Sequence, residues 1–172
     1  MSLVLVGLPA SGKSSVGALV ARRLGLPHVD TDEFIEQQAG RAIADIFAED
    51  GEAAFRALET AALRATLAVP DTVVSVGGGA VIAPENRALL AGHEVVWLDV
   101  TVATATRRAG LAKLRPLLLG DVRRQLEVLN AERRPLYEAV ATHRIDANRL
   151  NQRQAATAVL CVTGRLEGDD HD

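Results

Sequence analysis

The stretch Gly7-Leu8-Pro9-Ala10-Ser11-Gly12-Lys13-Ser14 decides the fold of this chain. It fits the pattern G-x-x-x-x-G-K-S without exception, with a short apolar run before it and a helical pattern after it. In such a loop the glycines let successive backbone N–H groups face a polyphosphate, and the following helix adds its positive end. The sequence therefore predicts a phosphate-binding loop between a buried strand and a helix.

The loop also provides most of the expected nucleotide contacts. Lys13 is expected to reach the terminal phosphates, and the hydroxyl of Ser14 is expected to bind Mg²⁺. A plain turn is the alternative, but four fixed positions coincide by chance only on the order of 1 % of the time in a chain of this length. The expected phosphate-binding residues are Ala10, Ser11, Gly12, Lys13, Ser14 and Ser15.

Short apolar runs and helical patterns alternate along the rest of the chain. Strands are expected at residues 2–6, 27–29, 73–76, 94–100 and 144–146. Helices are expected at residues 13–24, 32–38, 42–49, 52–67, 86–91, 104–108, 122–134 and 152–165. Pro135 is expected to break or kink the helix before it. This alternation predicts an α/β fold in three α/β/α layers, with a five-stranded parallel sheet covered by helices on both faces.

The order of these elements predicts where a ligand binds. Ligands of parallel sheets bind beyond the carboxyl ends of the strands, where the strand order switches. Gly7, Asp30 and Gly77 each follow an expected strand. We therefore expect them to gather at one edge of the sheet and to mark the site.

Composition narrows the class of protein. The 172 residues suffice for one domain, expected at 1–166, with a disordered polar tail at 167–172. A net charge of -3 argues against nucleic acid or an anionic membrane as partner, and no apolar run approaches the roughly 18 residues of a membrane span. The single Cys161 excludes an internal disulfide and is expected to be buried. The four histidines lack metal-ligand spacing, so we expect no permanent metal. We expect a cytoplasmic enzyme and, since nothing in the sequence suggests an obligate interface, a monomer.

A nucleotide-bound Mg²⁺ needs a carboxylate near the phosphates, usually at the end of a neighbouring strand. Two acids qualify, Asp99 and Asp30. We prefer Asp30, because Asp30-Thr31-Asp32 provides one acid for the metal and another for an acceptor. Asp99 is expected instead to cap the helix that begins near Thr101.

Several short motifs beyond the loop, taken together, resemble the shikimate kinase family. Each is weak alone, and any one arginine in them is more often a solvated surface charge. As an ordered set at the family's spacing they span nearly the whole chain. They are Asp30-Thr31-Asp32, Ala44-Asp45-Ile46-Phe47, residues 51–56, Gly77-Gly78-Gly79, Arg115-Pro116-Leu117-Leu118 and Arg133-x-Pro135-Leu136-Tyr137.

The resemblance implies how shikimate would be held, in an acceptor region at about residues 31–60 and on neighbouring segments. A carboxylate is best bound by planar guanidinium groups, and the family pattern assigns this to Arg56 and Arg133. Asp32 would accept from the hydroxyls and orient the attacking 3-hydroxyl or take its proton. The pattern brings backbone close to the ring at Gly77, Gly78 and Gly79.

The resemblance also implies a P-loop kinase with a lid at about residues 109–121. Arg115 lies in this lid and would contact both the nucleotide and the transferring phosphoryl group. A closing lid would keep water from consuming ATP.

On the adenine side, the family pattern assigns contacts to Arg108 and Arg149. Leu150 and Gln152 depart from it, because the family commonly carries an arginine and a proline there. Arg108 could still stack its guanidinium on one face of the base. The opposite face of the base would then be held less tightly.

The implied activity is transfer of the γ-phosphoryl group of ATP, with Mg²⁺, to the 3-hydroxyl of shikimate, in the pathway to chorismate and the aromatic amino acids. Lys13, Asp32 and Arg115 are expected to act on the reacting groups. Gluconate kinases and nucleoside monophosphate kinases are the nearest enzymatic alternatives, and a catalytically silent nucleotide-binding regulator is the alternative from another class. The triple glycine and the Asp-Thr-Asp sequence favour a shikimate kinase over the other two kinases.

Overall fold

The computed structural model describes residues 1–113 and 119–166. Its strands are β1 (Leu3–Val6), β2 (His28–Asp30), β3 (Val73–Ser75), β4 (Glu94–Asp99) and β5 (His143–Asp146). Its helices are α1 (Lys13–Leu24), α2 (Thr31–Ala39), α3 (Ile43–Leu67), the 3₁₀-helix η1 (Ala80–Ile82), α4 (Pro84–Leu90), α5 (Val102–Lys113), α6 (Leu119–Val140) and α7 (Gln152–Val162).

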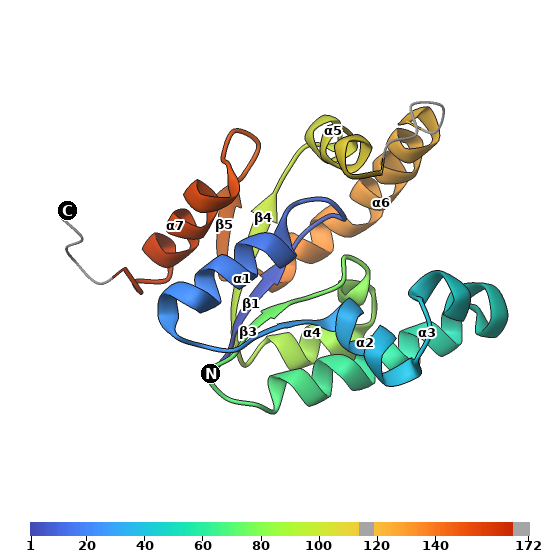
Figure 1. Ribbon diagram of the computed structural model, residues 1–172, viewed down its shortest axis with the longest axis horizontal. Coiled ribbons are helices and arrows are strands. Elements are labelled where there is room, and N and C mark those ends of the chain that lie inside the picture. The colour runs from blue at the N-terminus through green and yellow to red at the C-terminus, as the bar shows by residue number, and fades with distance from the viewer. Residues whose placement is uncertain (114–118, 167–172) are drawn as a thin grey trace.

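The five strands form one parallel sheet in the order β2-β3-β1-β4-β5 (Figure 1). Strand β1 lies at its centre, where Val4 pairs with Val74 of β3 and with Val95 of β4. All four residues of β1 are buried, because a central parallel strand is covered on both faces. This explains the continuous apolar run that precedes the phosphate-binding loop.

Different helices cover the two faces of the sheet. On one face, Leu3 and Leu5 pack with buried residues of α1 and α7. On the other face, Val4 and Val6 pack with residues of α3 and α4 and with Tyr137 of α6. Alternate side chains of β1 thus belong to two hydrophobic cores, one on each face of the sheet. The predicted three-layer architecture is confirmed.

The carboxyl ends of β1, β2 and β3 bring the predicted site segments to one edge. β1 continues into the loop, and α1 begins after Gly12, whose φ is 96°. The side chain of Asp30 caps α2 by accepting the backbone N–H groups of Asp32 and Glu33 at 2.9 and 3.3 Å. Gly77 follows β3 at the same edge. The predicted gathering of these segments is confirmed.

The acceptor region is built by α2 and α3. Helix α3 is interrupted at Gly51, where φ is 86° and ψ is 173°, at the place where the sequence predicts a break between two helices. Ile35, Ile46 and Phe55 form a small separate core across the interruption. In Figure 1 these helices lie to the right of the sheet, below the ends of α5 and α6.

The stretch expected to be a lid is helical on both sides of residues 114–118. Helix α5 extends to Lys113 and α6 begins at Leu119, so the expected end at Arg108 and start at Val122 were wrong. The reason is composition, because Ala, Leu and Lys favour a helix. Residues 114–118, which include Arg115, and the expected tail 167–172 lie outside the described residues.

Pro135 does not end α6, which continues to Val140. A proline inside a helix frees the carbonyl four residues before it, here that of Ala131. Pro135 and Ala131 both lie on the exposed side of the helix, where water can bind that carbonyl. Buried Tyr137 packs beyond the proline and holds the last turns in place.

Cys161 is exposed, so its expected burial was wrong. Helix α7 turns Ala156, Val159 and Leu160 to the sheet, and the next residue lies about 100° further round the helix. Among the described residues, no helix is long and apolar enough to cross a membrane.

Candidate active site

Lys13 is held inside the phosphate-binding loop. Its Nζ donates to the carbonyl oxygens of Gly7 and Leu8 at 3.0 and 2.8 Å and to the Ser11 hydroxyl at 3.4 Å. Burial lowers the pKa of Lys13 to about 8, although the charges of Asp32 and Asp30 act to raise it. Neutral carbonyls are weaker partners for an ammonium than an anion is, so a phosphate can draw this side chain to itself.

Ser14 and Asp30, the two residues predicted to bind Mg²⁺, are in contact. The Ser14 hydroxyl donates to Oδ2 of Asp30, whose Oδ1 caps α2. No group of three or more His, Cys, Asp or Glu that could hold a metal occurs in the part of the chain that the structure describes. Mg²⁺ usually takes one or two protein oxygens and completes its shell with waters and substrate phosphates. The pair therefore fits a Mg²⁺ whose remaining ligands are waters and nucleotide phosphates.

Asp32 lies in the first turn of α2, against Gly77. A Cβ at Gly77 would stand 2.5 Å from Oδ1 of Asp32, so only glycine leaves room for this carboxylate. The N–H of Gly77 donates to the Thr31 hydroxyl at 3.0 Å and ties the two segments together. Burial and the charge of Asp30 raise the pKa of Asp32, while Lys13 opposes them. A carboxylate with a raised pKa is suited to accept a proton from a hydroxyl.

Arg56 lies on α3, five residues after the interruption at Gly51. Its Nη1 donates to Oε1 of Glu59 at 2.8 Å, and its Nε has no hydrogen-bond partner within the described residues. A Cβ at Gly79 would meet Nη1 of Arg56 at 2.5 Å, so the third glycine allows the guanidinium to approach the strand end. Burial raises the pKa of Glu59, against the lowering effect of Arg56.

Arg133 and Tyr137 reach the same region from α6. Arg133 is 8 % exposed, its Nε lacks a partner among the residues described, and its charge lowers the pKa of Lys13. The Tyr137 hydroxyl donates to the carbonyl of Gly78 at 2.6 Å, and burial raises the pKa of Tyr137 to about 12. The structure thus brings Arg133 and Arg56 to the strand ends from two helices, with N–H groups that suit a carboxylate.

A cavity of about 570 Å³ lies between the phosphate-binding loop and the loop after β5. Arg108 enters it from α5 and donates to the carbonyl oxygens of Ser11 at 3.2 Å and Ala147 at 2.9 Å. These hydrogen bonds are made by the N–H groups at the edge of the guanidinium, so its flat face stays available to stack on a base. The lining also includes Leu150 and Gln152, the two departures from the family pattern.

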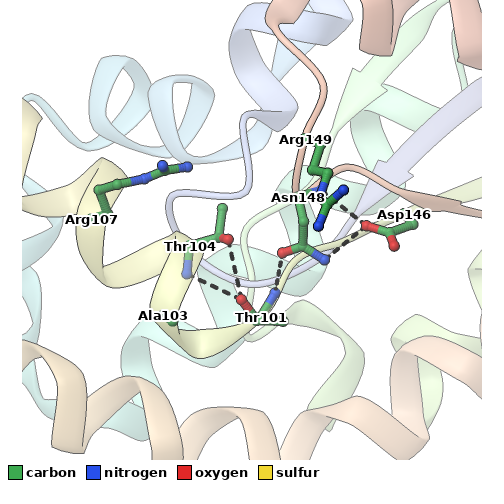
Figure 2. A pocket seen from close by; sticks show the side chains of 7 residues that line it. All are labelled: Thr101, Ala103, Thr104, Arg107, Asp146, Asn148 and Arg149. Carbon is green, nitrogen blue, oxygen red and sulfur yellow. Dashed lines mark hydrogen bonds between the residues drawn. The ribbon is translucent and has the colours of Figure 1, made fainter.

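Arg149 does not line that cavity. It lines a neighbouring hollow of about 710 Å³ that shares no lining residue with the first (Figure 2). There Oδ1 of Asn148 accepts the N–H of Thr101 at 2.8 Å, and its Nδ2 donates to Asp146 at 2.7 Å. The contact of Arg149 with a nucleotide therefore stays a prediction.

Asp99 does not cap α5, so that expectation was wrong. The hydroxyl of Thr101 does so, by accepting the N–H of Thr104 at 3.2 Å. The carboxylate of Asp99 accepts from Arg134 and Arg144 at distances of 2.7 to 3.0 Å. Because both of its oxygens are bound by guanidinium groups, Asp99 is a poor candidate for the metal, and Asp30 is the better one.

Glu59 and Thr31 were not predicted as site residues. Glu59 is 2 % exposed and lies on the otherwise apolar face of α3 that carries Phe55 and Leu63. A charged residue in an apolar helical row is a readable signal, because such a group is buried only with a partner. Thr31 gave no such signal, since its role depends on where β3 ends.

Comparison with known proteins agrees with this geometry. The sequence profile of shikimate kinase matches residues 9–163. The shikimate kinase of Mycobacterium bovis (strain BCG / Pasteur 1173P2) is 54 % identical over 149 residues, which cover 86 % of this chain and 85 % of that protein. The shikimate kinase of Mycobacterium marinum is 52 % identical over 165 residues, which cover 95 % of this chain and 88 % of that protein.

Solved structures lead to the same family. Shikimate kinase from Acinetobacter baumannii in complex with shikimate matches with a TM-score of 0.87 and 34 % identity, over 96 % of this chain and 95 % of that one. A gluconokinase from Sinorhizobium meliloti matches with a TM-score of 0.56 at 16 % identity, which is a likeness of fold alone. The chain belongs to the shikimate kinase family.

Proposed function

We propose that this chain transfers the γ-phosphoryl group of ATP to the 3-hydroxyl of shikimate, giving shikimate 3-phosphate and ADP. One observation carries the proposal: the three glycines after β3 lie against both the phosphate-binding loop and the acceptor side chains. A Cβ at Gly78 would stand 3.3 Å from the carbonyl oxygen of Gly7, and a Cβ at Gly77 or Gly79 would stand 2.5 Å from Asp32 or Arg56. This contact supports one site for the phosphates and the acceptor. Holding both reactants in one site removes much of the entropic barrier to their reaction.

Two guanidinium groups bind the acceptor's carboxylate in this proposal. Arg56 and Arg133 approach from α3 and α6, and each has an unpartnered Nε within the described residues. The buried carboxylate of Glu59 holds one edge of Arg56, so the direction of that side chain is set before the acceptor arrives. The Tyr137 hydroxyl holds the carbonyl of Gly78 in place, which fixes the backbone that would lie beside the shikimate ring.

Asp32 then acts on the 3-hydroxyl. It orients the hydroxyl and takes its proton as the oxygen bonds to the γ-phosphorus and the bond to ADP breaks. Lys13 stabilises the negative charge that develops on the phosphate oxygens. Ser14 and Asp30 would hold Mg²⁺, which neutralises phosphate charge when bound. Arg115, predicted from the family pattern, would add a further positive charge.

The remaining parts of the proposal rest on the sequence. The acidic balance, with a net charge of -3, supports an enzyme that acts on small molecules without a nucleic acid or membrane partner. We propose that it works in the cytoplasm as a monomer.

Turnover with alternative acceptors tests the function. Purified protein is supplied with Mg²⁺-ATP and, in separate reactions, shikimate, gluconate or AMP, and ADP release is followed in a coupled assay. Release that depends on shikimate alone is expected. Faster release with gluconate or AMP would assign the other kinase activities, and no acceptor-dependent release with retained ATP binding would indicate a nucleotide-binding regulator.

A further inference from the structure

Asp99 joins three elements at the end of β4. Arg134 of α6 donates from Nη1 to Oδ1 at 2.9 Å and from Nη2 to Oδ2 at 3.0 Å, a two-bond fork. Arg144 of β5 donates from Nε and Nη2 to Oδ2 at 3.0 and 2.7 Å. Both guanidinium carbons lie 4.9 Å from the centroid of the Trp97 ring. Below, these four residues are called the Asp99 cluster.

The geometry of the cluster is well defined. The side chain of Asp99 is 10 % exposed and accepts four N–H groups, so its position is over-determined. A fork of two parallel bonds fixes both the distance and the orientation of a guanidinium, which a single bond to a lysine does not. The ring of Trp97 adds a cation–π surface on which both guanidinium groups lie.

The cluster holds α6 at the turn that carries the acceptor residues. Arg133, the neighbour of Arg134, lies buried in the site, and Tyr137 donates to the carbonyl of Gly78 at 2.6 Å. Residues four apart share a helix face, so Arg133 and Tyr137 both point into the site, while Arg134 projects about 100° further round toward Asp99. Apolar side chains of α6, among them Leu126 and Leu136, pack against the sheet, but such contacts are not directional. The fork at Asp99 adds a directional contact that fixes the rotation of the helix at this turn.

The other ion pair on α6 has a different character. Arg123 donates to Glu127 at 3.1 Å, and both side chains are more than half exposed and belong to the same helix. This pair ties the helix to itself and not to the sheet. The Asp99 cluster is thus the ionic link, among the described residues, between α6 and the strands.

We propose that Arg134 is a positioning residue: its fork on Asp99 sets the rotation of α6 and so places the guanidinium of Arg133 for the acceptor's carboxylate. The inference rests on the proposed function, in which Arg133 binds that carboxylate. In the proposed function the nucleotide is bound by α1 and by the loops around Arg108, so the effect is expected at the acceptor.

Arg144 provides a matched control. It binds the same carboxylate and lies at the same distance from the same ring, but it belongs to β5 and carries no acceptor residue with it. Arg134→Met and Arg144→Met therefore each remove two N–H donors from Asp99 and one cation–π contact from Trp97. Only the first removes a contact of α6.

The test measures KM for shikimate and for ATP, with the thermal midpoint and the emission of Trp97, the single tryptophan of the chain. Arg134→Met is expected to raise KM for shikimate about fivefold and to leave KM for ATP within twofold, as expected for residues coupled through contact. Arg144→Met should change the emission and the midpoint similarly but leave both KM values within twofold. Arg134→Lys, which keeps the charge and loses the fork, should fall between wild type and Arg134→Met.

Two results would overturn the inference. One is a KM for shikimate that is unchanged in Arg134→Met, and the other is an equal rise in both methionine variants, which would make the cluster a stabiliser of the sheet alone. Should Arg134→Met not fold, Arg134→Lys decides by the same comparison. Wild-type protein that does not turn over shikimate would remove the proposed function itself, an outcome distinct from a normal Arg134→Met in an active wild type.

Discussion

The phosphate end and the acceptor end of the site are built in different ways. The phosphate end is one continuous stretch, 7–15, whose shape comes from its own glycines and from the helix that follows. The acceptor end is assembled from α2, α3, the loop after β3 and α6, and contacts such as Asp32 against Gly77 span more than forty residues of sequence.

This difference has a physical consequence. A continuous loop carries its geometry with it, so a substitution in it acts directly on the phosphates. At the acceptor end side chains depend on other elements, as Asp32 of α2 depends on the space left at Gly77 after β3 and Arg133 depends on how α6 is oriented. Substitutions there should separate the two substrates, while substitutions in the loop should stop the reaction outright.

Loss of Lys13 should have the largest effect. Lys13→Met removes a charge that is needed mainly in the transition state, so kcat should fall about 10³-fold with the fold intact. Steady-state kinetics with the thermal midpoint as the control checks this. A variant that retains a tenth of wild-type kcat would remove the catalytic role of Lys13.

Variants of Asp30 and Asp32 should then respond differently to Mg²⁺, because one acid is assigned to the metal and the other to the acceptor. Asp32→Asn should lower kcat about 10²-fold at every Mg²⁺ concentration, because it removes the proton acceptor. Asp30→Asn should lose activity that added Mg²⁺ restores. Mg²⁺ titrations of both variants provide the measurement, and rescue of the Asp32 variant alone would reverse the two assignments.

The guanidinium at the acceptor should discriminate between the substrates. Arg133→Lys keeps the charge but loses the planar fork, so KM for shikimate should rise about tenfold while KM for ATP changes little. Initial rates with each substrate varied in turn measure this. Equal changes in both constants would indicate a general defect in α6.

The pH dependence connects the two ends. Burial lowers the pKa of Lys13 to about 8, so the free enzyme loses this positive charge as the pH rises through 8. We expect kcat/KM for ATP to fall above that pH by about tenfold per unit, because this constant reports the free enzyme. In Asp32→Asn the fall should begin at lower pH, since the charge of Asp32 raises the pKa of Lys13. A flat profile to pH 10 would contradict the assignment.

The base side should show the smallest effect. Leu150 and Gln152 line the cavity beside Arg108. The double variant Leu150→Arg and Gln152→Pro should tighten ATP by at most about 1 kcal/mol, the scale of an exposed cation–π contact, and should sharpen selection of ATP over GTP. KM values for both nucleotides measure it, and unchanged values would show that the departure is neutral.

Much of this could be read from the sequence, since local patterns determine local structure. The phosphate-binding loop, the strand that precedes it and the break at Gly51 each depend on residues within a few positions. The ordered motifs also indicated Arg56 and Arg133, because family spacing substitutes for three-dimensional proximity. Burial of Cys161 was misjudged, because one position on a helix changes the face by about 100°.

The sequence by itself thus determined the layered fold, the phosphate-binding loop and the identity of the acceptor candidates. Only the tertiary structure decided that Asp99 binds Arg134 and Arg144, that Asp32 lies against Gly77, and that Tyr137 holds the carbonyl of Gly78. Each of these contacts joins elements whose relative positions follow from packing on the sheet. No local pattern encodes such a distance, because it is set by the whole core and not by the neighbours along the chain.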